Sequence, residues 1–327
     1  TLNMADLALR VAQLTGDSAL IARAAALVLL VVFGLKAALV PLYFWLPGTY
    51  AAASAPVAAL FAIMTKVGAY SIIRLYVLAF GADAGEAAWL AAPWLLPAAL
   101  LTLALGMTGV LAARSLGQMA SFAVIGSMGL LLSTVAVFTE QATSAALYYL
   151  IHSTLAAGAL FLIADLVAER RGLLRDRLVL APRIAQGGLI ASLFFIAAIA
   201  MTGMPPLSGF IGKLLILSAV ATAPGWDWAW PWSWAVILST TLIGVIGFAR
   251  VGSSVFWKAN DDVEAPPPSD PRADLVAPLL LLGLLILRRN GAVFLFYVVL
   301  CAVGIGYLVT TGAADDIGTQ AVSTWRE

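Results

Sequence analysis

A succession of long apolar segments constrains the fold of this chain more than any other feature. An α-helix needs about 20 residues, most of them apolar, to cross a bilayer. Charged residues make up only 11% of the 327 residues, against roughly a quarter in a soluble domain. The sequence therefore predicts an all-α polytopic membrane protein. The predicted spans are residues 24–46, 55–80, 88–112, 117–139, 144–168, 187–222 (interrupted), 233–256, 275–287 and 291–311.

The two ends of the chain depart from this pattern. Residues 1–20 mix charged and apolar side chains and predict an amphipathic surface stretch. The run 275–287 is too short to cross a bilayer alone. We expect residues 1–287 to form one transmembrane domain and 288–327 to be an apolar tail of unassigned structure. Because the chain starts at Thr1 without a charged leader region, we expect it to begin within a longer protein.

The charged loops predict an orientation. Cytoplasmic loops of membrane proteins carry an excess of Lys and Arg. The loop after the fifth predicted span is Arg-rich, whereas the opposite loops hold Asp83, Glu86, Glu140 and Asp227. A Trp-rich stretch at 226–234 fits the interfacial belt of that opposite side. We therefore place the Arg-rich loop in the cytoplasm. We also expect the chain to lie in a bacterial cytoplasmic membrane. The basic residues on that side are Arg114, Arg170, Arg171, Arg175, Arg177, Arg183, Lys258 and Arg272.

Four ionisable residues lie inside the predicted spans, namely Lys36, Lys66, His152 and Lys213. A charge at the bilayer centre costs at least about 2.5–3.5 kcal/mol on insertion scales. Four of them would cost on the order of 10 kcal/mol, which is comparable with the net stability of a domain. Each must therefore face a protein interior or a wet cavity, and an ion or proton path is the default hypothesis.

Structural roles are the alternative for these residues. Lys66, with Arg74 eight residues further on, could extend towards a membrane surface. His152 could be a hydrogen-bonding residue between two helices. Lys36 and Lys213 fit a structural role less well because each lies close to a helix-breaking proline.

The prolines predict two broken helices, at Pro41 and at the pair Pro205 and Pro206. Proline has no N–H and disfavours helix in the residue before it. The freed carbonyls are tolerated at membrane depth only beside protein or water. Broken helices with a charge close by expose dipole ends to transported ions. We therefore predict a small hydrated cavity in which Lys213 exchanges a proton.

The remaining composition excludes several function classes. Cys301 is the one cysteine and His152 the one histidine, so neither a disulfide nor a Cys or His metal cluster can form within the chain. The sequence contains no cysteine cluster, nucleotide fingerprint or haem pair, so we predict a transporter subunit rather than an enzyme, with no cofactor. The net charge of +1 gives no reason to expect a nucleic acid. No Asp or Glu lies deep in a span, so the buried cations lack an acidic partner in this chain.

Residues 33–76 resemble the antiporter-like membrane subunits shared by Mrp cation/proton antiporters and the respiratory NADH dehydrogenase complex. The lysine followed by P-L-x-x-W-L-P, then A-P-V-x-A-L and T-K-V-G-x-Y, is most similar to the D-type subunit of Mrp antiporters. The likeness continues in "SFAVIGSMG" (121–129), "ALYYLIHSTLAAGALFLIADLV" (146–167) and "TGMPPLSGFIGK" (202–213). It spans roughly residues 1–260.

This resemblance implies a fold of about 14 helices in two inverted repeats, each with a discontinuous helix, of which this chain would supply about the last eight. By matching motif, Lys36 is the central lysine of the first broken helix and Lys66 the connecting lysine on the next helix. His152 and Lys213 would continue the hydrophilic axis to the second broken helix. The acidic partner of Lys36 would lie on a helix that precedes this chain.

The chain departs from the family pattern at one place in this region. The family often has W-L-P-D-A-H after the first broken helix, and here Gly48, Thr49 and Tyr50 follow the W-L-P. The departure removes one polar cluster.

Three functional hypotheses follow. The first is a proton-translocating subunit of a multi-subunit Na⁺ or K⁺/H⁺ antiporter, with other membrane subunits as partners and a relay through Lys213, His152, Lys66 and Lys36. The second is the proton-pumping membrane subunit of a redox complex related to NADH dehydrogenase or hydrogenase. The third is a truncated, non-transporting scaffold. The amino-acid sequence of residues 33–76 favours the antiporter hypothesis over the redox-pump hypothesis.

Overall fold

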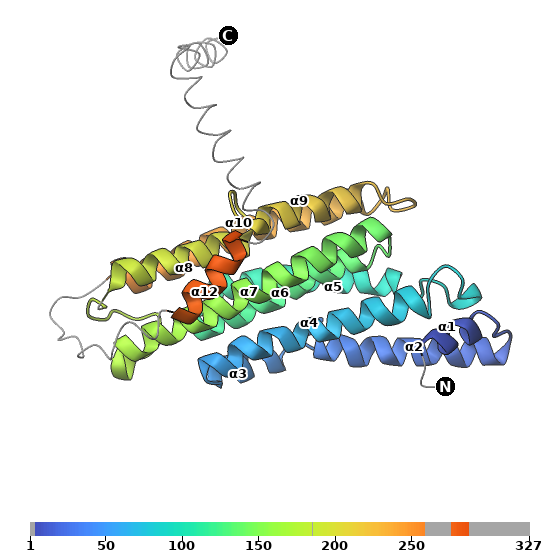
Figure 1. The fold of residues 1–327 in the computed structure, drawn as a ribbon, viewed down its shortest axis with the longest axis horizontal. Helices are drawn as coiled ribbons and strands as arrows, with labels where there is room; N and C mark the ends of the chain where they lie inside the picture. The colour runs from blue at the N-terminus through green and yellow to red at the C-terminus, as the bar shows by residue number, and fades with distance from the viewer. Residues whose placement is uncertain (1–3, 185, 259–275, 288–327) are drawn as a thin grey trace, which may run out of the picture. The chain divides into compact units, whose positions relative to one another are not determined.

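The computed structural model describes residues 4–184, 186–258 and 276–287, and those of them up to Leu285 form one compact unit. Every regular element in these described residues is a helix, as the apolar runs predict (Figure 1). The α-helices are α1 Met4–Val11, α2 Asp17–Lys36, α3 Trp45–Ala52, α4 Ala55–Leu78, α5 Ala92–Ala112, α6 Leu116–Val135, α7 Glu140–Arg170, α8 Gly187–Thr202, α9 Ser208–Ala221, α10 Trp230–Gly252 and α12 Val276–Leu287. Short helices are η1 Gly85–Ala87, η2 Gly172–Leu174 and the π-helix η3 Ser253–Trp257.

Six of the described helices are long and apolar enough to cross a membrane, namely α2, α4, α5, α6, α7 and α10 continued by η3. They follow the predicted spans, and the chain is a multi-pass membrane protein. Helix α12 has 12 residues, fewer than a crossing helix needs, as expected for the run 275–287. The predicted span 291–311 and the predicted tail 288–327 lie outside the described residues.

The first crossing helix starts earlier than predicted. Helix α2 begins at Asp17, inside the segment 1–20 that we expected to lie on the surface. Gly16 has a φ of 60°, which a glycine adopts without strain, and the carboxylate of Asp17 favours the positive end of the helix dipole. Only α1 keeps the amphipathic character predicted for this segment, and in it Arg10 Nε donates to Asp6 Oδ1 at 2.9 Å.

Helix α6 lies at the centre of the unit. Nearly all of its residues are buried, and it packs against α3, α5 and α7. Its approach to α5 is so close that a Cβ added to Gly106 would overlap the backbone of Gly126, and one added to Gly129 would overlap the backbone of Leu103. Small residues are what allows helices in a membrane to pack at such short range. The first broken helix meets this pair through α3, which packs on α6, whereas α8 and α9 pack mainly against α7.

The two predicted broken helices are confirmed. Residues 37–44 separate α2 from α3, and residues 203–207 separate α8 from α9. The breaks contain Pro41 and the pair Pro205 and Pro206 respectively. Helices α8 and α9 follow one another along one edge of the unit (Figure 1). Helices α8 and α9 are each too short to cross alone, and α2 ends at the first break. Each broken helix therefore exposes carbonyl and amide groups within the bundle.

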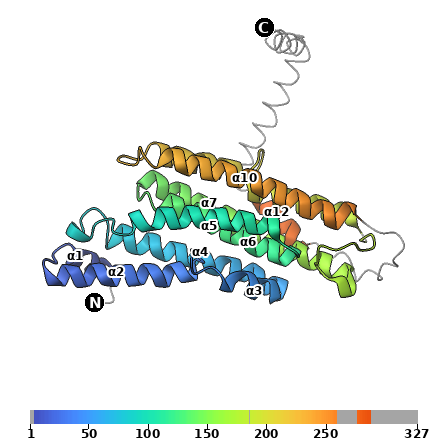
Figure 2. The same ribbon diagram turned by 180° about the vertical axis from the view of Figure 1, so that it is seen from behind.

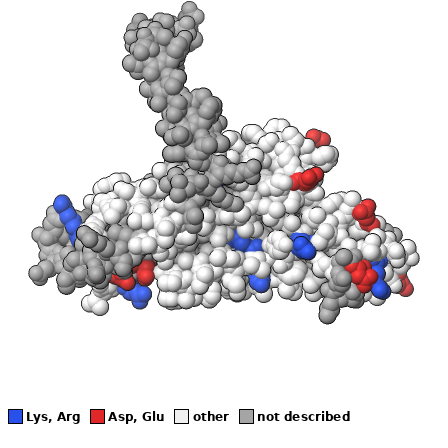
Figure 3. Space-filling model, in the orientation of Figure 1, with Lys and Arg blue, Asp and Glu red and all other residues white. Residues whose placement is uncertain are grey.

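Charged side chains gather towards the two ends of the bundle, with a wide belt of uncharged surface between them that a few basic residues interrupt (Figure 3). At one end, the loop after α5 meets the loop after α7. Ser115 and Arg177 form an isolated antiparallel bridge, and Leu178 N donates to Arg114 O at 2.9 Å. The basic loops that the sequence places on one side of the membrane are therefore in contact.

Arg171 holds the second of these loops in place. Its two terminal nitrogens donate to the carbonyl oxygens of Arg177 and Val179, each at 2.6 Å. Burial lowers the pKa of Arg171, and the nearby carboxylate of Asp176 acts in the opposite direction. The basic end of the bundle is thus built from hydrogen bonds between loops as well as from charge.

Candidate functional site

The second broken helix lies against α7. Helix α8 ends at Thr202, and Gly203 follows in the left-handed conformation with a φ of 68°, which a glycine favours at a helix end. A Cβ added to Gly209, in the first turn of α9, would overlap the Ala200 carbonyl and lie 2.7 Å from His152 Nε2. Glycine at this position allows the two half-helices and the histidine to meet.

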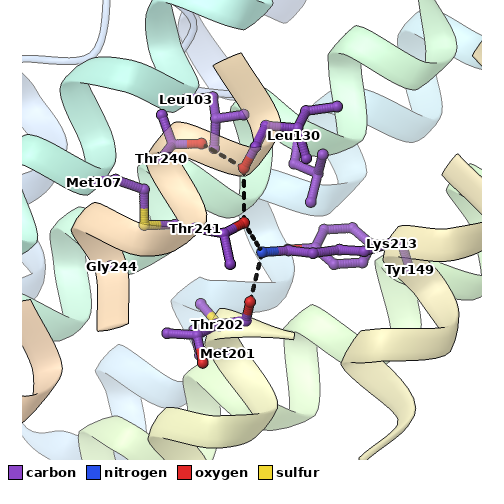
Figure 4. A pocket seen from close by; sticks show the side chains of 11 residues that line it. Leu103, Met107, Leu130, Tyr149, Met201, Thr202, Lys213, Thr240, Thr241 and Gly244 are labelled. Carbon is purple, nitrogen blue, oxygen red and sulfur yellow. Dashed lines mark hydrogen bonds between the residues drawn. The ribbon is translucent and has the colours of Figure 1, made fainter. Parts of the chain in front are cut away.

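Lys213, in the second turn of α9, reaches back across this break. Its Nζ donates to the carbonyl oxygen of Thr202 at 2.5 Å and to Thr241 Oγ1, on α10, at 2.6 Å (Figure 4). Thr202 is the last residue of α8, so its carbonyl lacks an intrahelical partner and lies at the negative end of the helix dipole. The lysine therefore joins both halves of the broken helix to α10.

The two bonds of Lys213 are compatible with either protonation state. The Thr241 hydroxyl donates its own proton to Ile237 O at 2.7 Å, so its oxygen accepts from the lysine. A carbonyl oxygen also only accepts. An ammonium has three N–H donors and a neutral amine has two, so both forms can keep both bonds. Lys213 can thus gain or lose a proton at its remaining position without leaving the site.

A small cavity adjoins this lysine. It leaves about 10 Å³ for the centre of a water molecule and is lined by Lys213, Tyr149, Thr202, Thr240 and Thr241 together with apolar side chains. A cavity of this size is at the lower limit for one water. The arrangement provides a place where a single water can exchange a proton with the lysine.

His152, on α7, also links the two half-helices. Its Nδ1 is 2.8 Å from Ser208 Oγ, in the first residue of α9, and its Nε2 is 3.0 Å from the carbonyl oxygen of Ala200, in α8. Because a carbonyl only accepts, we infer that Nε2 carries hydrogen and that Nδ1 of the neutral ring accepts from the Ser208 hydroxyl. Uptake of a proton at Nδ1 would require that hydroxyl to turn and accept. The ring and the serine together form a switchable hydrogen bond.

Lys66, on α4, points into the bundle. It is 2% exposed, and its Nζ donates to Ser127 Oγ of α6 at 2.9 Å. Ser127 in turn donates to Val124 O at 2.7 Å. The alternative in which Lys66 extends towards a membrane surface is therefore wrong for this structure.

Lys36 differs from the other three residues. It is the last residue of α2, and its side chain is exposed on the surface of the described unit. The first break itself is packed, because Val40 N donates to Thr102 Oγ1 at 2.9 Å and a Cβ added to Gly68 of α4 would lie 2.8 Å from Ala37 N. The break thus touches the helix that carries Lys66. The structure turns Lys66, His152 and Lys213 inward and leaves Lys36 at the outer surface of this unit.

Sequence reasoning did not identify the hydroxyl partners of these residues. Ser127, Thr202 and Ser208 lie in stretches that carry the family likeness, but a serine or threonine in a span gives no signal of its own. Thr241 lies outside those stretches. Proximity to a buried cation is a property of the folded chain, so no pattern in the sequence could have singled these residues out.

The fold and the site define a multi-pass membrane protein, helical in its described residues, in which Lys213 and His152 bond across a broken helix. The chain belongs to the NADH:quinone oxidoreductase/Mrp antiporter transmembrane family, whose model matches residues 1–244. It is 36% identical over 307 residues to the D-type subunit of a probable K⁺/H⁺ antiporter of Rhizobium meliloti (strain 1021), covering 86% of this chain and 56% of the relative. It is 37% identical over 280 residues to the D-type subunit of the Na⁺/H⁺ antiporter of Bacillus subtilis (strain 168), covering 82% and 52%.

A solved structure shares the fold. The Mrp complex from Dietzia sp. DQ12-45-1b matches with a TM-score of 0.67 and 26% identity, covering 83% of this chain and 47% of that chain. The predicted resemblance to antiporter-like subunits is therefore confirmed. The chain spans about half the length of the curated relatives it matches.

Proposed function

We propose that this chain is part of a proton-translocating membrane subunit of a multi-subunit Na⁺ or K⁺/H⁺ antiporter. Its partners would be the other membrane subunits of the complex, and its location the cytoplasmic membrane of a bacterium. Two relatives with 36% and 37% identity are named as D-type subunits of K⁺/H⁺ and Na⁺/H⁺ antiporters. Their names support an antiporter subunit over an enzyme.

One structural observation supports the proposal above the others. Lys213 bonds to the carbonyl end of a broken helix and to Thr241, beside room for one water, so it can change protonation state while its position is held. We propose that protons pass along Lys213, His152, Lys66 and Lys36 through intervening waters.

The mechanism follows from the hydrogen-bond roles of these groups. A water in the cavity would take a proton from Lys213, and the Ser208–His152 pair would pass a proton by turning the serine hydroxyl. Lys66 would accept and release a proton while it remains bonded to Ser127. Coulomb coupling to a carboxylate would link the steps, since two charges 4 Å apart interact by about 4 kcal/mol at an effective dielectric constant near 20.

The test is cation-driven proton flux in inverted vesicles that contain the complete complex. Addition of Na⁺ or K⁺ should dissipate a preformed pH gradient, and we expect Lys213→Ala and Lys36→Ala to abolish that response with the complex still assembled. Lys213→Arg should abolish it as well, because an arginine keeps the charge but cannot release its proton. Lys258→Ala, at an exposed position after η3, is the matched control and should transport like the wild type.

Three other results would contradict the proposal. A gradient that forms only after addition of an electron donor would assign the chain to a redox-driven pump. Transport retained in Lys213→Ala would make the lysine structural and the chain a scaffold. Transport retained in Lys213→Arg would show that this position needs a charge and not a proton exchange.

A further inference from the structure

An open hollow lies at the basic end of the bundle and shares no lining residue with the cavity at Lys213. It is formed by the loop after α5, the loop after η2 and the last turn of α10, and its volume is about 590 Å³. A water molecule occupies about 30 Å³ in the liquid, so this hollow holds a much larger group. Three of its lining residues are Arg114, Arg177 and Arg250. We therefore call it the arginine hollow.

The guanidinium groups of the arginine hollow are free to bind an anion. Among the described residues, none of the three forms an ion pair with a carboxylate. Arg250 Nη2 donates to the carbonyl oxygen of Ala113 at 2.6 Å, which fixes the group at the end of α5 and leaves its other N–H donors available. The nearby carboxylate of Asp176 is already bonded to Gly117 N at 2.8 Å and lines a different hollow. Arginine binds phosphate through two parallel hydrogen bonds, so the arginine hollow suits a phosphate group.

An apolar row on α10 leads to the arginine hollow. Leu238, Leu242 and Ile246 are 54%, 62% and 51% exposed, and with Arg250 they follow one another at intervals of four residues. Residues spaced in this way lie on one face of a helix. The row therefore runs along the membrane-spanning part of α10 and ends at a guanidinium.

Helix α5 carries a second such row. Leu101 and Leu105 are exposed, and the face they share continues to Ala112, which lines the arginine hollow. Helices α5 and α10 pack side by side (Figure 2), and Gly247 of α10 brings them together because a Cβ there would lie 3.0 Å from Val110. Two apolar rows therefore end at one cationic hollow, which lies at the end of α5 and the last turn of α10.

We propose that the arginine hollow binds the phosphate of an anionic phospholipid from the leaflet at the basic end, with the acyl chains along the rows of α5 and α10. Basic pockets between transmembrane helices on the cytoplasmic side recognise lipid head groups in this way. The apolar rows favour a lipid over a soluble phosphate, which would gain nothing from them. This site is independent of the proton path and would stand if the proposed transport function failed.

The experiment measures lipid binding to the purified complete complex by native mass spectrometry. The complex is titrated with phosphatidylglycerol, with zwitterionic phosphatidylcholine, and with glycerol 3-phosphate and inorganic phosphate as soluble anions. The test variant is Arg114→Gln with Arg177→Gln, whose guanidinium groups make no described hydrogen bond. Arg175→Gln is the matched control, since Arg175 is exposed in the same loop and does not line the arginine hollow.

We expect saturable phosphatidylglycerol binding that weakens about fivefold for each guanidinium lost, or about 25-fold in the double variant. The Arg175→Gln control should bind like the wild type, and phosphatidylcholine should bind equally to all forms. Thermal unfolding of the double variant in phosphatidylcholine should be unchanged, which excludes misfolding as the cause.

Three results would overturn the proposal. Equal phosphatidylglycerol affinity in all variants would mean that the lipid does not use these arginines. Displacement of the lipid by glycerol 3-phosphate or inorganic phosphate at equal concentration would make this a soluble anion site. Loss of a partner subunit from the double variant, with lipid binding unchanged, would identify the hollow as a contact for an acidic protein segment.

Discussion

Lys213 and Lys66 are held in the bundle by groups that can only accept a hydrogen bond. The oxygens of Thr241 and Ser127 are acceptors for the lysines because each hydroxyl proton is already donated to a backbone carbonyl of its own helix. This arrangement gives each buried lysine an acceptor that is not a carboxylate. A carboxylate would stabilise the ammonium and hold its proton on the lysine more firmly. At the scale of single residues, serine and threonine hydroxyls therefore accept hydrogen bonds from buried lysines and leave those lysines able to exchange a proton.

Thr241→Val tests this role of the hydroxyl. The change removes one of the two acceptors of Lys213 Nζ at almost constant side-chain shape. A hydrogen bond to a charged group contributes about 1.5–3 kcal/mol, so we expect cation-driven proton flux in vesicles to fall about tenfold or more.

The matched control for this prediction is Thr240→Val. Thr240 lines the same cavity, and its hydroxyl likewise donates within its own helix, to Val236 O at 2.6 Å. Lys213 donates to Thr241 and not to Thr240. We expect near wild-type flux from it. Equal flux in the two variants would mean that the bond from Lys213 to Thr241 has no part in transport.

At the scale of elements, the second broken helix depends on close contact between α8, α9 and α7. His152 bonds to both half-helices, and Lys213 of α9 bonds to the last carbonyl of α8. These bonds hold α8 and α9 in register. Gly209 lies where these contacts converge. The element is therefore a joint whose bonds are made by the same residues that would carry protons.

Gly209→Ala should disrupt this joint. The new Cβ would overlap the Ala200 carbonyl and press on His152 Nε2, so α9 must move away from α8. Overpacking of this kind costs about 1–3 kcal/mol, and we expect a lower thermal midpoint for the purified complex together with loss of cation-driven flux.

Gly188→Ala, in the first turn of the same broken helix, provides the comparison. Nothing lies within 4 Å of a Cβ added there, so stability and flux should stay at the wild-type level. If Gly209→Ala transported normally, the contact between His152 and the two half-helices would not be needed for function.

At the scale of the whole unit, the basic and acidic loops separate to opposite ends. The basic loops after α5 and α7 are joined by the Ser115–Arg177 bridge, and Arg250 of α10 bonds to the first of them at Ala113 O. The excess of Lys and Arg predicts that this end faces the cytoplasm. The orientation also determines which leaflet would supply a lipid to the arginine hollow.

Cysteine labelling tests the orientation. In a background without native cysteines, we introduce Arg175→Cys at the basic end or Asp227→Cys at the opposite end, both at exposed positions. A membrane-impermeant maleimide should label D227C in intact cells and R175C only in inverted vesicles. Labelling of both positions from the same side would contradict the predicted topology.

The spans and the two breaks could be predicted because they depend on local chemistry. The length of an apolar run determines whether a helix can cross, and a proline removes a backbone donor and disfavours helix before it. Pro97 shows that this signal is not absolute, because it lies inside α5. The start of α2 was missed because the charges of residues 1–20 suggested a surface, although Asp17 is favourable in a first helical turn. Local patterns therefore predicted the elements, with errors at their ends.

The sequence by itself determined that this chain is a multi-pass helical membrane protein with two proline breaks and four cations to accommodate. Only the tertiary structure decided how they are accommodated. The partners Ser127, Ser208 and Thr241 lie 61, 56 and 28 residues from Lys66, His152 and Lys213. The tertiary structure also gives the two lysines near proline breaks different environments. Lys36 lies at the surface of the described unit, whereas Lys213 lies beside a cavity. The physical reason is that burial and hydrogen bonding depend on which helices pack together, and residues far apart in the chain determine that packing.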